Sequence, residues 1–322
     1  MSLLERLGVA VPVVGAGMGG GLSAAPLTIA IGRAGGLGQI GFAAPSELRA
    51  QMATHREEAD GGPLAVNLLL PFARRAHWEA AGEADVVVTF WGRPRRRTGR
   101  VWIHQCGSVE EAEAAAAAGA DGVIAQGIEA GGHVRGTTPA LDLTERVRAA
   151  LGADFPVWCA GGIAERGDVE NALAAGAEAA VVGTRFLMAE ESGAHPAYQQ
   201  KLAQAQDTIL TELFGAGWPD APHRVVANDA TRRWLSGDPR GPSWVRGLNR
   251  ASAPVLRRTP LGLVDRATRL QRPSRPLLLP VAPTAAHPSS FVDSAPLYAG
   301  ESISRINDVR RSADIVAELA GR

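Results

Sequence analysis

Short apolar runs alternate with alanine-rich segments along the first two thirds of the chain, and this alternation limits the possible folds more than any other feature. Most of the runs are rich in β-branched residues and almost continuous in hydrophobicity, as expected of parallel strands covered on both faces. The alanine-rich segments have helical character, so each pair indicates one βα unit. Eight runs can be distinguished, at residues 9–14, 36–40, 64–70, 85–90, 101–105, 121–126, 156–160 and 179–183.

Eight such units predict an α/β protein of the (β/α)₈ TIM-barrel class, in which ligands bind where the strands end and the βα loops begin. Two of the helices carry clear boundary signals. Ser108 precedes an alanine-rich helix that stops at Gly119, and a helix over residues 165–175 stops at Gly176. The fourth unit is short, because only WGRPRRRTGR separates strands four and five, which leaves little room for a helix.

The alternation stops after residue 206, so we assign residues 1–206 to the barrel. Residues 207–290 are rich in arginine, proline and tryptophan and show no sustained period, which predicts a smaller, mostly helical or irregular second domain or lid. Trp218, Trp234 and Trp244 favour a folded lid over a linker, because exposed indole rings would be costly in water. The apolar pattern within residues 291–322 predicts a final amphipathic helix that returns to the barrel.

Charge and cysteine content limit the classes of function. The chain has 33 basic and 33 acidic residues, so no overall charge favours nucleic acid or an anionic membrane as a partner. Cys106 and Cys159 lie in or just after apolar runs, which suits reduced thiols in a cytoplasmic protein. We find no signal peptide and no apolar run of the roughly 18–20 residues that a membrane helix needs. We expect no metal site, and the sequence does not decide between a monomer and a homodimer.

The first βα loop contains GAGMGGG at residues 15–21, which formally matches the G-x-G-x-x-G pattern of dinucleotide-binding crossovers. That pattern also needs an acidic residue about twenty positions further on. The first acidic residue is Glu47, and Pro26 falls where the phosphate-binding helix should run unbroken. The better interpretation is a loop whose backbone approaches a flat ring closely, because its glycines have no Cβ.

Two further glycine clusters follow the last two strands, AGGIA at residues 160–164 and GTRF at residues 183–186. In barrels the corresponding loops often bind a phosphate through backbone N–H groups and the N-terminus of a short helix. Gly161, Gly162, Gly183 and Thr184 are therefore candidate phosphate ligands. The alternative is that they are ordinary turn residues.

The sixth strand ends at Gln126 and leads into GIEAGGHVRG, which places one acid and one histidine among four glycines at the same rim of the barrel. We expect His133 to face the mouth of the pocket. An imidazole with a pKa near 6.5 can accept a proton from a carbon acid there. Glu129 either orients the imidazole ring or faces solvent, and we favour the first. A purely structural histidine is the alternative.

These motifs together resemble the nitronate monooxygenase family. The resemblance rests on AQGIEAGGHVRG, VWCAGGIA and AAVVGTRFLMAEESGAHPAYQQKL. It extends to GAGMGGGLS, AGGLGQIG, VNLLLP, GWPDAPHRVVAN and YAGES, so it covers almost the whole chain. It implies an FMN-dependent (β/α)₈ barrel with a smaller second domain, which oxidises alkyl nitronates with O₂ to a carbonyl compound and nitrite.

The resemblance also implies roles for single residues. His133 matches the histidine proposed as the catalytic base of the family, and Gly161, Gly162, Gly183 and Thr184 match the phosphate ligands. The residues that would line the flavin are Gly17, Met18, Gly19, Asn67, Gln105, Gln126, Gly131 and Gly132.

Two features depart from the family pattern. The chain has Glu301 where the family has a glutamine, which would place a carboxylate near the ligand. The arginines at positions 93 and 95–97 have no family counterpart, and we expect them in a surface loop. Two other functions stay open. One is an NADH-dependent flavin reductase of the same fold, acting on an enoyl thioester or a quinone, and the other is a non-catalytic flavin- or phosphate-binding barrel.

Overall fold

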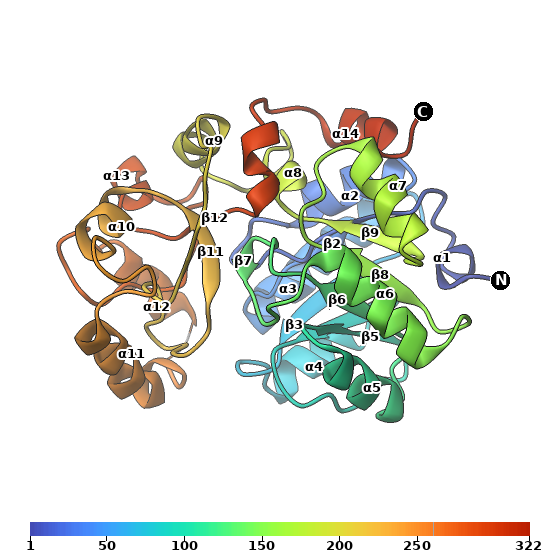
Figure 1. The fold of residues 1–322 in the computed structure, drawn as a ribbon, viewed down its shortest axis with the longest axis horizontal. Coiled ribbons are helices and arrows are strands. Elements are labelled where there is room, and N and C mark those ends of the chain that lie inside the picture. Colours follow the sequence, from blue (N-terminus) through green and yellow to red (C-terminus); the bar gives the residue numbers. More distant parts are fainter. Residues whose placement is uncertain (260) are drawn as a thin grey trace.

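The computed structural model describes residues 1–259 and 261–322, and residue 260, which falls in the expected lid, lies outside the described residues. The chain forms a barrel of parallel strands surrounded by helices, with a second domain beside it (Figure 1). In Figure 1 the barrel runs from blue to green and the second domain from yellow to orange. The C-terminal segment, in red, returns to the barrel.

Eight parallel strands form the barrel and confirm the predicted fold class. They are β1 (Val13–Gly15), β2 (Gln39–Ile40), β3 (Ala65–Leu69), β4 (Val86–Phe90), β5 (Val101–Cys106), β6 (Gly122–Gln126), β8 (Val157–Ala160) and β9 (Ala179–Val182). Their order in the sheet is β1–β9–β8–β6–β5–β4–β3–β2. A parallel bridge between Val14 and Leu37 closes the barrel, and the Gly15 N–H donates to the Leu37 carbonyl at 2.8 Å.

The inside of the barrel is filled by apolar side chains. Leu37, Val86, Ile103 and Trp158 belong to one buried cluster to which segments all around the barrel contribute. Burying a side chain of this size stabilises the fold by about 1.5–3 kcal/mol relative to leaving it in water. The packed interior holds the ends of the strands in place, and with them the start of each loop that follows.

Helices cover the outside of the barrel, and the predicted boundaries are correct. Ser108 accepts a hydrogen bond from the Glu111 N–H at the start of α5, and Gly119 and Gly176 have φ of +87° and +93° after α5 and α7. Within residues 91–100, all of them described, no helix separates β4 from β5. No helix among the described residues has the length and apolar character needed to span a bilayer. The helices are α1 (Leu3–Arg6), α2 (Ala25–Arg33), α3 (Pro45–Glu58), α4 (Arg75–Ala81), α5 (Val109–Ala117), α6 (Ala140–Leu151), α7 (Arg166–Ala174) and α8 (Thr184–Leu187).

The second domain contains a small antiparallel sheet that the sequence did not predict. Its central strand, β11 (His223–Val226), pairs with β10 (Ile209–Thr211), with β12 (Leu297–Tyr298) and with β7 (Gly132–His133) from the barrel loop. Strands of two to four residues are too short to show an alternating pattern. Helix α9 (Pro196–Ala203) comes before β10 in the chain. The helices that follow are α10 (Asp229–Trp234), α11 (Ser243–Leu256), α12 (Leu261–Thr268) and α13 (Ser289–Val292).

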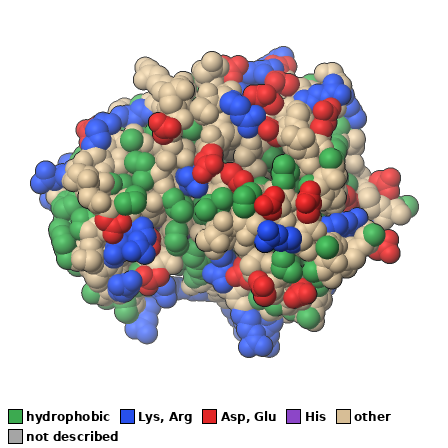
Figure 2. All heavy atoms as spheres, viewed as in Figure 1, with side chains coloured by type: hydrophobic (Ala, Val, Ile, Leu, Met, Phe, Trp, Pro, Cys, Tyr) green, Lys and Arg blue, Asp and Glu red, His purple; other side chains and the backbone are tan. Residues whose placement is uncertain are grey.

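The tryptophans of the second domain differ in burial. Trp218 is 4% exposed, but Trp244 is 56% exposed, so the expectation that all three indoles avoid water is wrong for Trp244. Trp244 and Trp234 form a T-shaped pair, and Trp234 Nε1 donates to the Pro273 carbonyl at 2.8 Å. Figure 2 shows hydrophobic side chains at the surface of this domain, interleaved with basic ones.

The C-terminal segment packs against the barrel. It contains a short 3₁₀ helix, η1 (Glu301–Arg305), and then α14 (Ser312–Leu319). Ile315, Val316 and Leu319 are buried in the same cluster as residues of α2 and α7. The predicted final amphipathic helix is α14, and Val309 lies before its start and is exposed.

Three glycines of the loop at residues 127–136 are required by contacts between backbone segments: Gly127, Gly131 and Gly136. A Cβ on Gly131 would lie 2.5 Å from the Gly300 nitrogen, and a Cβ on Gly136 would overlap the Gly107 carbonyl. A Cβ on Gly127 would overlap the first residue of α6. The loop therefore packs backbone to backbone against three other segments, which determines its path over the end of the barrel.

We expect Gly136→Ala to destabilise the protein by about 1–3 kcal/mol, because the added methyl group would push two backbones apart. Gly167→Ala is the control, since a Cβ on Gly167 of α7 meets no atom within 4 Å. Alanine there should leave the stability unchanged or raise it. Thermal unfolding followed by circular dichroism measures both variants. If Gly136→Ala melted at the temperature of the wild type, the loop would not be packed as described.

Candidate active site

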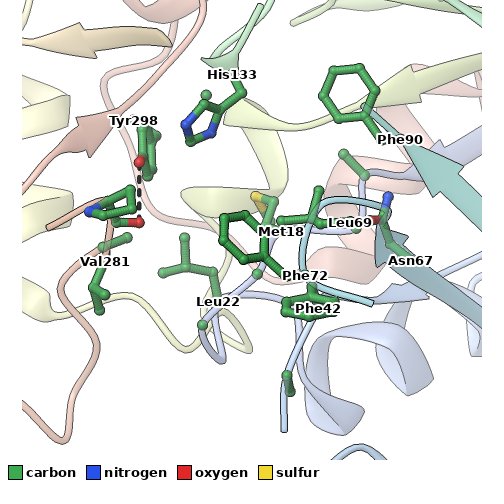
Figure 3. Close-up of a pocket in the computed structure, with 18 of the residues that line it drawn as sticks. Met18, Leu22, Phe42, Asn67, Leu69, Phe72, Phe90, His133, Val281 and Tyr298 are labelled. Atoms are coloured by element: carbon green, nitrogen blue, oxygen red, sulfur yellow. Dashed lines mark hydrogen bonds between the residues drawn. The ribbon is translucent and has the colours of Figure 1, made fainter. Parts of the chain in front are cut away.

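A cavity of about 1080 Å³ opens at the ends of the barrel strands, between the barrel and the second domain. Figure 3 shows His133 and Tyr298 together on one side of this cavity, with Met18 and Leu22 of the first loop across from them. Every residue predicted as base or flavin contact lies on the cavity wall. These are Gly17, Met18, Gly19, Asn67, Gln105, Gln126, Gly131, Gly132, His133, Gly161, Gly162, Gly183 and Thr184.

The loop after β1 is held against the neighbouring strands. The Met18 N–H donates to Ser23 Oγ at 2.8 Å, and a Cβ on Gly17 would overlap the side chain of Asn67 on β3. Pro26 lies in the first turn of α2, where a missing N–H costs nothing. The expectation that this proline interrupts the helix is therefore wrong. The loop still presents its backbone to the cavity.

The two glycine clusters after β8 and β9 lie side by side, because these strands are neighbours in the barrel. Gly161 and Gly162 have φ of +122° and +76°, a conformation that favours glycine. Gly183 precedes the four-residue helix α8, and Thr184 is its first residue. Thr184 Oγ1 accepts a hydrogen bond from the Gly300 N–H at 2.9 Å. Backbone conformation alone accounts for the first two glycines, so a phosphate at this place stays a prediction.

The three predicted amide side chains have different surroundings. Gln126 Nε2 donates to the His133 carbonyl at 2.9 Å, and its Oε1 accepts from the Arg135 N–H at 3.4 Å. The Gln126 amide therefore holds the loop that carries the histidine. Asn67 on β3 and Gln105 on β5 line the cavity and stay candidates for contact with a bound ring.

His133 lies on β7, opposite His223 of β11. Its imidazole stacks on the Trp218 indole, with ring centroids 3.8 Å and planes 21° apart. The rings of Trp91 and Tyr298 lie 5.9 and 5.7 Å away. Within the described chain His133 Nε2 is buried and has no hydrogen-bond partner. Burial, reinforced by His223, holds the pKa of His133 well below its ordinary value, so the ring is neutral at physiological pH and able to accept a proton.

His223 supports His133 but cannot exchange protons with it. Its Nε2 accepts a hydrogen bond from the Phe214 N–H at 3.3 Å, and its Nδ1 lies 2.9 Å from the Ala221 carbonyl, so Nδ1 carries the proton. Burial lowers the pKa of His223 to about 4. With both ring nitrogens engaged, His223 stays neutral and serves to place β11 against β7.

Glu129 does not orient His133, contrary to the expectation. Its carboxylate accepts a hydrogen bond at 3.0 Å from the N–H of Ala140, the first residue of α6. A negative charge is favoured there, because the first N–H groups of a helix lack partners within the helix. The Glu129 carbonyl also accepts from the Glu301 N–H at 2.9 Å. Glu129 therefore anchors the loop.

Glu301 directs its carboxylate away from the cavity. It pairs with Arg224 of β11 at 2.9 Å, and the same guanidinium donates to the Ile128 carbonyl at 2.7 Å. The cavity wall includes Gly300 and Ser302, the neighbours of Glu301, but not Glu301 itself. The Glu301 carboxylate, which was expected near the ligand, instead pairs with Arg224. Through Arg224 it links the C-terminal segment to the second domain and to the histidine loop.

The arginines at positions 93 and 95–97 are exposed in the loop between β4 and β5, as predicted. Arg96 pairs with Asp121 at 3.1 Å, and the Arg97 guanidinium lies 5.6 Å from the centre of the Trp78 ring. Both contacts are at the surface, where such pairs contribute little to stability.

An aromatic wall around His133 was not predicted. Trp218 belongs to the second domain, and its ring packs edge to face against two aromatic rings of the barrel. The centroid distances are 5.1 Å to Phe72 and 5.2 Å to Trp91. Trp91 has a φ of +65°, which is uncommon for an aromatic residue. These residues are far apart in the sequence, and nothing in the periodicity links them. The one signal was Trp218 itself, a tryptophan between a glycine-rich turn and His223.

Known proteins resemble this chain over most of its length. The nitronate monooxygenase family matches residues 93–320. A 5-hydroxy-7a-methyl-1-oxo-octahydro-1H-indene-4-carboxyl-CoA dehydrogenase of Mycobacterium tuberculosis is 32% identical over 254 residues, which span 73% of this chain and 68% of that protein.

Two solved structures share the fold over nearly the whole chain. A nitroalkane oxidase from Streptomyces ansochromogenes is 27% identical, with a TM-score of 0.77 over 99% of this chain and 97% of that one. FabK from Thermotoga maritima is also 27% identical, with a TM-score of 0.76 over 98% of this chain and 94% of that one. The chain belongs to the nitronate monooxygenase family and is an enzyme of the oxidoreductase class.

Proposed function

We propose that the protein is an FMN-dependent enzyme that oxidises alkyl nitronates, and the nitroalkanes from which they form, with O₂ to a carbonyl compound and nitrite. The observation that carries this proposal is the neutral imidazole of His133, whose Nε2 is buried without a partner in the described chain, in a residue that lines a large cavity. A base at this place suits a carbon acid. A nitroalkane is a carbon acid, and the nitronate is its conjugate anion.

The cavity wall fits a flavin mononucleotide. A Cβ on Gly162 would meet no atom closer than 3.7 Å and one on Gly20 or Gly132 none within 4 Å, so the backbone at these loops is open to a ligand. The clusters after β8 and β9, with the start of α8, would hold the phosphate through backbone N–H groups. The first loop, Asn67 and Gln105 would face the flat ring. When bound, FMN supplies a redox centre that takes electrons from the substrate and is reoxidised by O₂.

The chain itself supplies the proton acceptor. His133 Nε2 would take the α-proton of a neutral nitroalkane, and the Trp218 ring stacked on the imidazole excludes water from that face. A preformed nitronate has already lost this proton and does not need the base. The two forms of one substrate therefore separate the role of His133 from that of the cofactor.

A reductase of the same fold is the second candidate. The cavity of about 1080 Å³ is large enough to suit a bulky substrate beside a flavin, and the relative from Mycobacterium tuberculosis is named as a carboxyl-CoA dehydrogenase. An enoyl thioester or a quinone, reduced at the expense of NADH, would suit a cavity of this size.

We expect the purified protein to show a flavin absorbance spectrum and to release nitrite when ethyl nitronate is added in air. Nitrite is measured by a colorimetric assay, and O₂ uptake with an electrode. Anaerobic addition of NADH should bleach the flavin slowly or not at all. Rapid bleaching by NADH without nitrite release in the first assay would support the reductase instead.

His133→Asn should lower kcat/KM for neutral nitroethane by about 10²- to 10⁴-fold, the usual contribution of a general base. Turnover of ethyl nitronate should fall much less, because that substrate brings no α-proton to remove. The FMN content, measured by absorbance after denaturation, should stay at the wild-type level. Equal losses on both substrates would argue against His133 as the base.

The pH dependence of nitroethane turnover should report the lowered pKa of His133. The base acts in its neutral form, so kcat/KM falls only as the pH drops through its folded-state pKa, which lies below the ordinary 6.5. We therefore expect little loss between about pH 7 and 6.5 and a decline at lower pH. Initial rates of nitrite release across this range test the point. An acid limb centred at or above 6.5 would contradict the description of the site.

A further inference from the structure

The two stacked rings at the cavity each carry a buried nitrogen without a partner. In the described residues, neither His133 Nε2 nor Trp218 Nε1 has a hydrogen-bond acceptor or donor within reach. The ring centroids are only 3.8 Å apart, and both residues line the cavity. Buried indole N–H groups usually find an acceptor, so an unpaired one beside a cavity calls for an explanation.

The Trp218 indole is held in place from three sides. Its backbone N–H donates to the Gly215 carbonyl at 2.9 Å, in a turn where Gly217 has a φ of +83°. Its ring packs edge to face against Phe72 and Trp91 and stacks on His133. These contacts hold the indole ring in place. Because an indole can only donate, the missing partner is an acceptor atom.

We propose that Trp218 Nε1–H donates a hydrogen bond to an oxygen of the nitro or nitronate group of the substrate. This inference rests on the proposed function. When the α C–H bond of a nitroalkane breaks, the proton passes to His133 Nε2. The electron pair of that bond forms the C=N bond of the nitronate, and the negative charge moves onto the nitro oxygens. Both residues line the cavity and their ring centroids are 3.8 Å apart, so one small substrate can contact the donor and the base together.

The same arrangement favours the transition state over the ground state. The nitro oxygen gains charge as the proton leaves, so a hydrogen bond from Trp218 strengthens during the step. The imidazole becomes cationic at the same time, and the stacked indole face attracts a cation. Trp218 thus acts on both charges that form.

Trp218→Phe tests the donor, because phenylalanine keeps an aromatic ring against His133 but has no N–H. We expect kcat/KM for nitroethane to fall by about 10- to 100-fold, the range for losing a hydrogen bond to a charged group. The acid limb of the pH profile should stay in place, since His133 remains covered. Trp234→Phe is the matched control. Its Nε1 already donates to Pro273 away from the cavity wall, so its kinetics should equal those of the wild type.

Nitrate binding to the holoenzyme separates this inference from the proposed function. Nitrate is a planar oxyanion that needs no base and undergoes no reaction, and calorimetric titration gives its Kd. We expect Trp218→Phe to raise the Kd for nitrate by about tenfold or more, and Trp234→Phe to leave it unchanged. If the wild type bound nitrate but oxidised no nitronate, the proposed function would be refuted, and the hydrogen bond from Trp218 to an oxyanion would still be supported. If the wild type did not bind nitrate, or if Trp218→Phe bound it with the same Kd, the proposed hydrogen bond from Trp218 would be refuted.

Discussion

The pairing of β7 with β11 is the contact on which the rest of the site depends. β7 belongs to a loop of the barrel and is two residues long, whereas β11 belongs to the second domain. The pairing places His133 opposite His223, and the Arg224 guanidinium holds the same loop through the Ile128 carbonyl. The barrel alone does not provide these contacts. His133 is therefore positioned by both domains, and the cavity lies where they meet.

The acidic residues near the histidine loop are arranged so that the imidazole stays neutral. Glu129 accepts from the start of α6, and Glu301 pairs with Arg224. A carboxylate next to His133 would favour the imidazolium and raise its pKa. With both carboxylates engaged elsewhere, burial dominates and the pKa of His133 falls. Two contacts that anchor the loop and the C-terminal segment thus keep both carboxylates paired with groups other than the His133 ring.

The barrel was predictable from the sequence because its signals are local. The contacts that explain several individual residues were not predictable. The eight apolar runs became the eight strands, and Gly119 and Gly176 follow helices as expected. Gly131 was expected to line the flavin, yet Gly131 and its loop neighbour Gly136 are required by neighbouring backbone. Glu129 was assigned to His133 because the two are close in sequence, whereas the fold brings the N-terminus of α6 to its carboxylate.

The sequence by itself determined the strands, the helix ends and the set of loops that gather at one rim of the barrel. These features depend on periodicity, capping and glycine conformation, all of which act between residues close in the chain. Only the tertiary structure decided that Trp218 stacks on His133, that Glu301 pairs with Arg224, and that Nε2 of His133 and Nε1 of Trp218 are left without partners in the described chain. Those outcomes depend on burial and on contacts between distant segments, which no local pattern encodes.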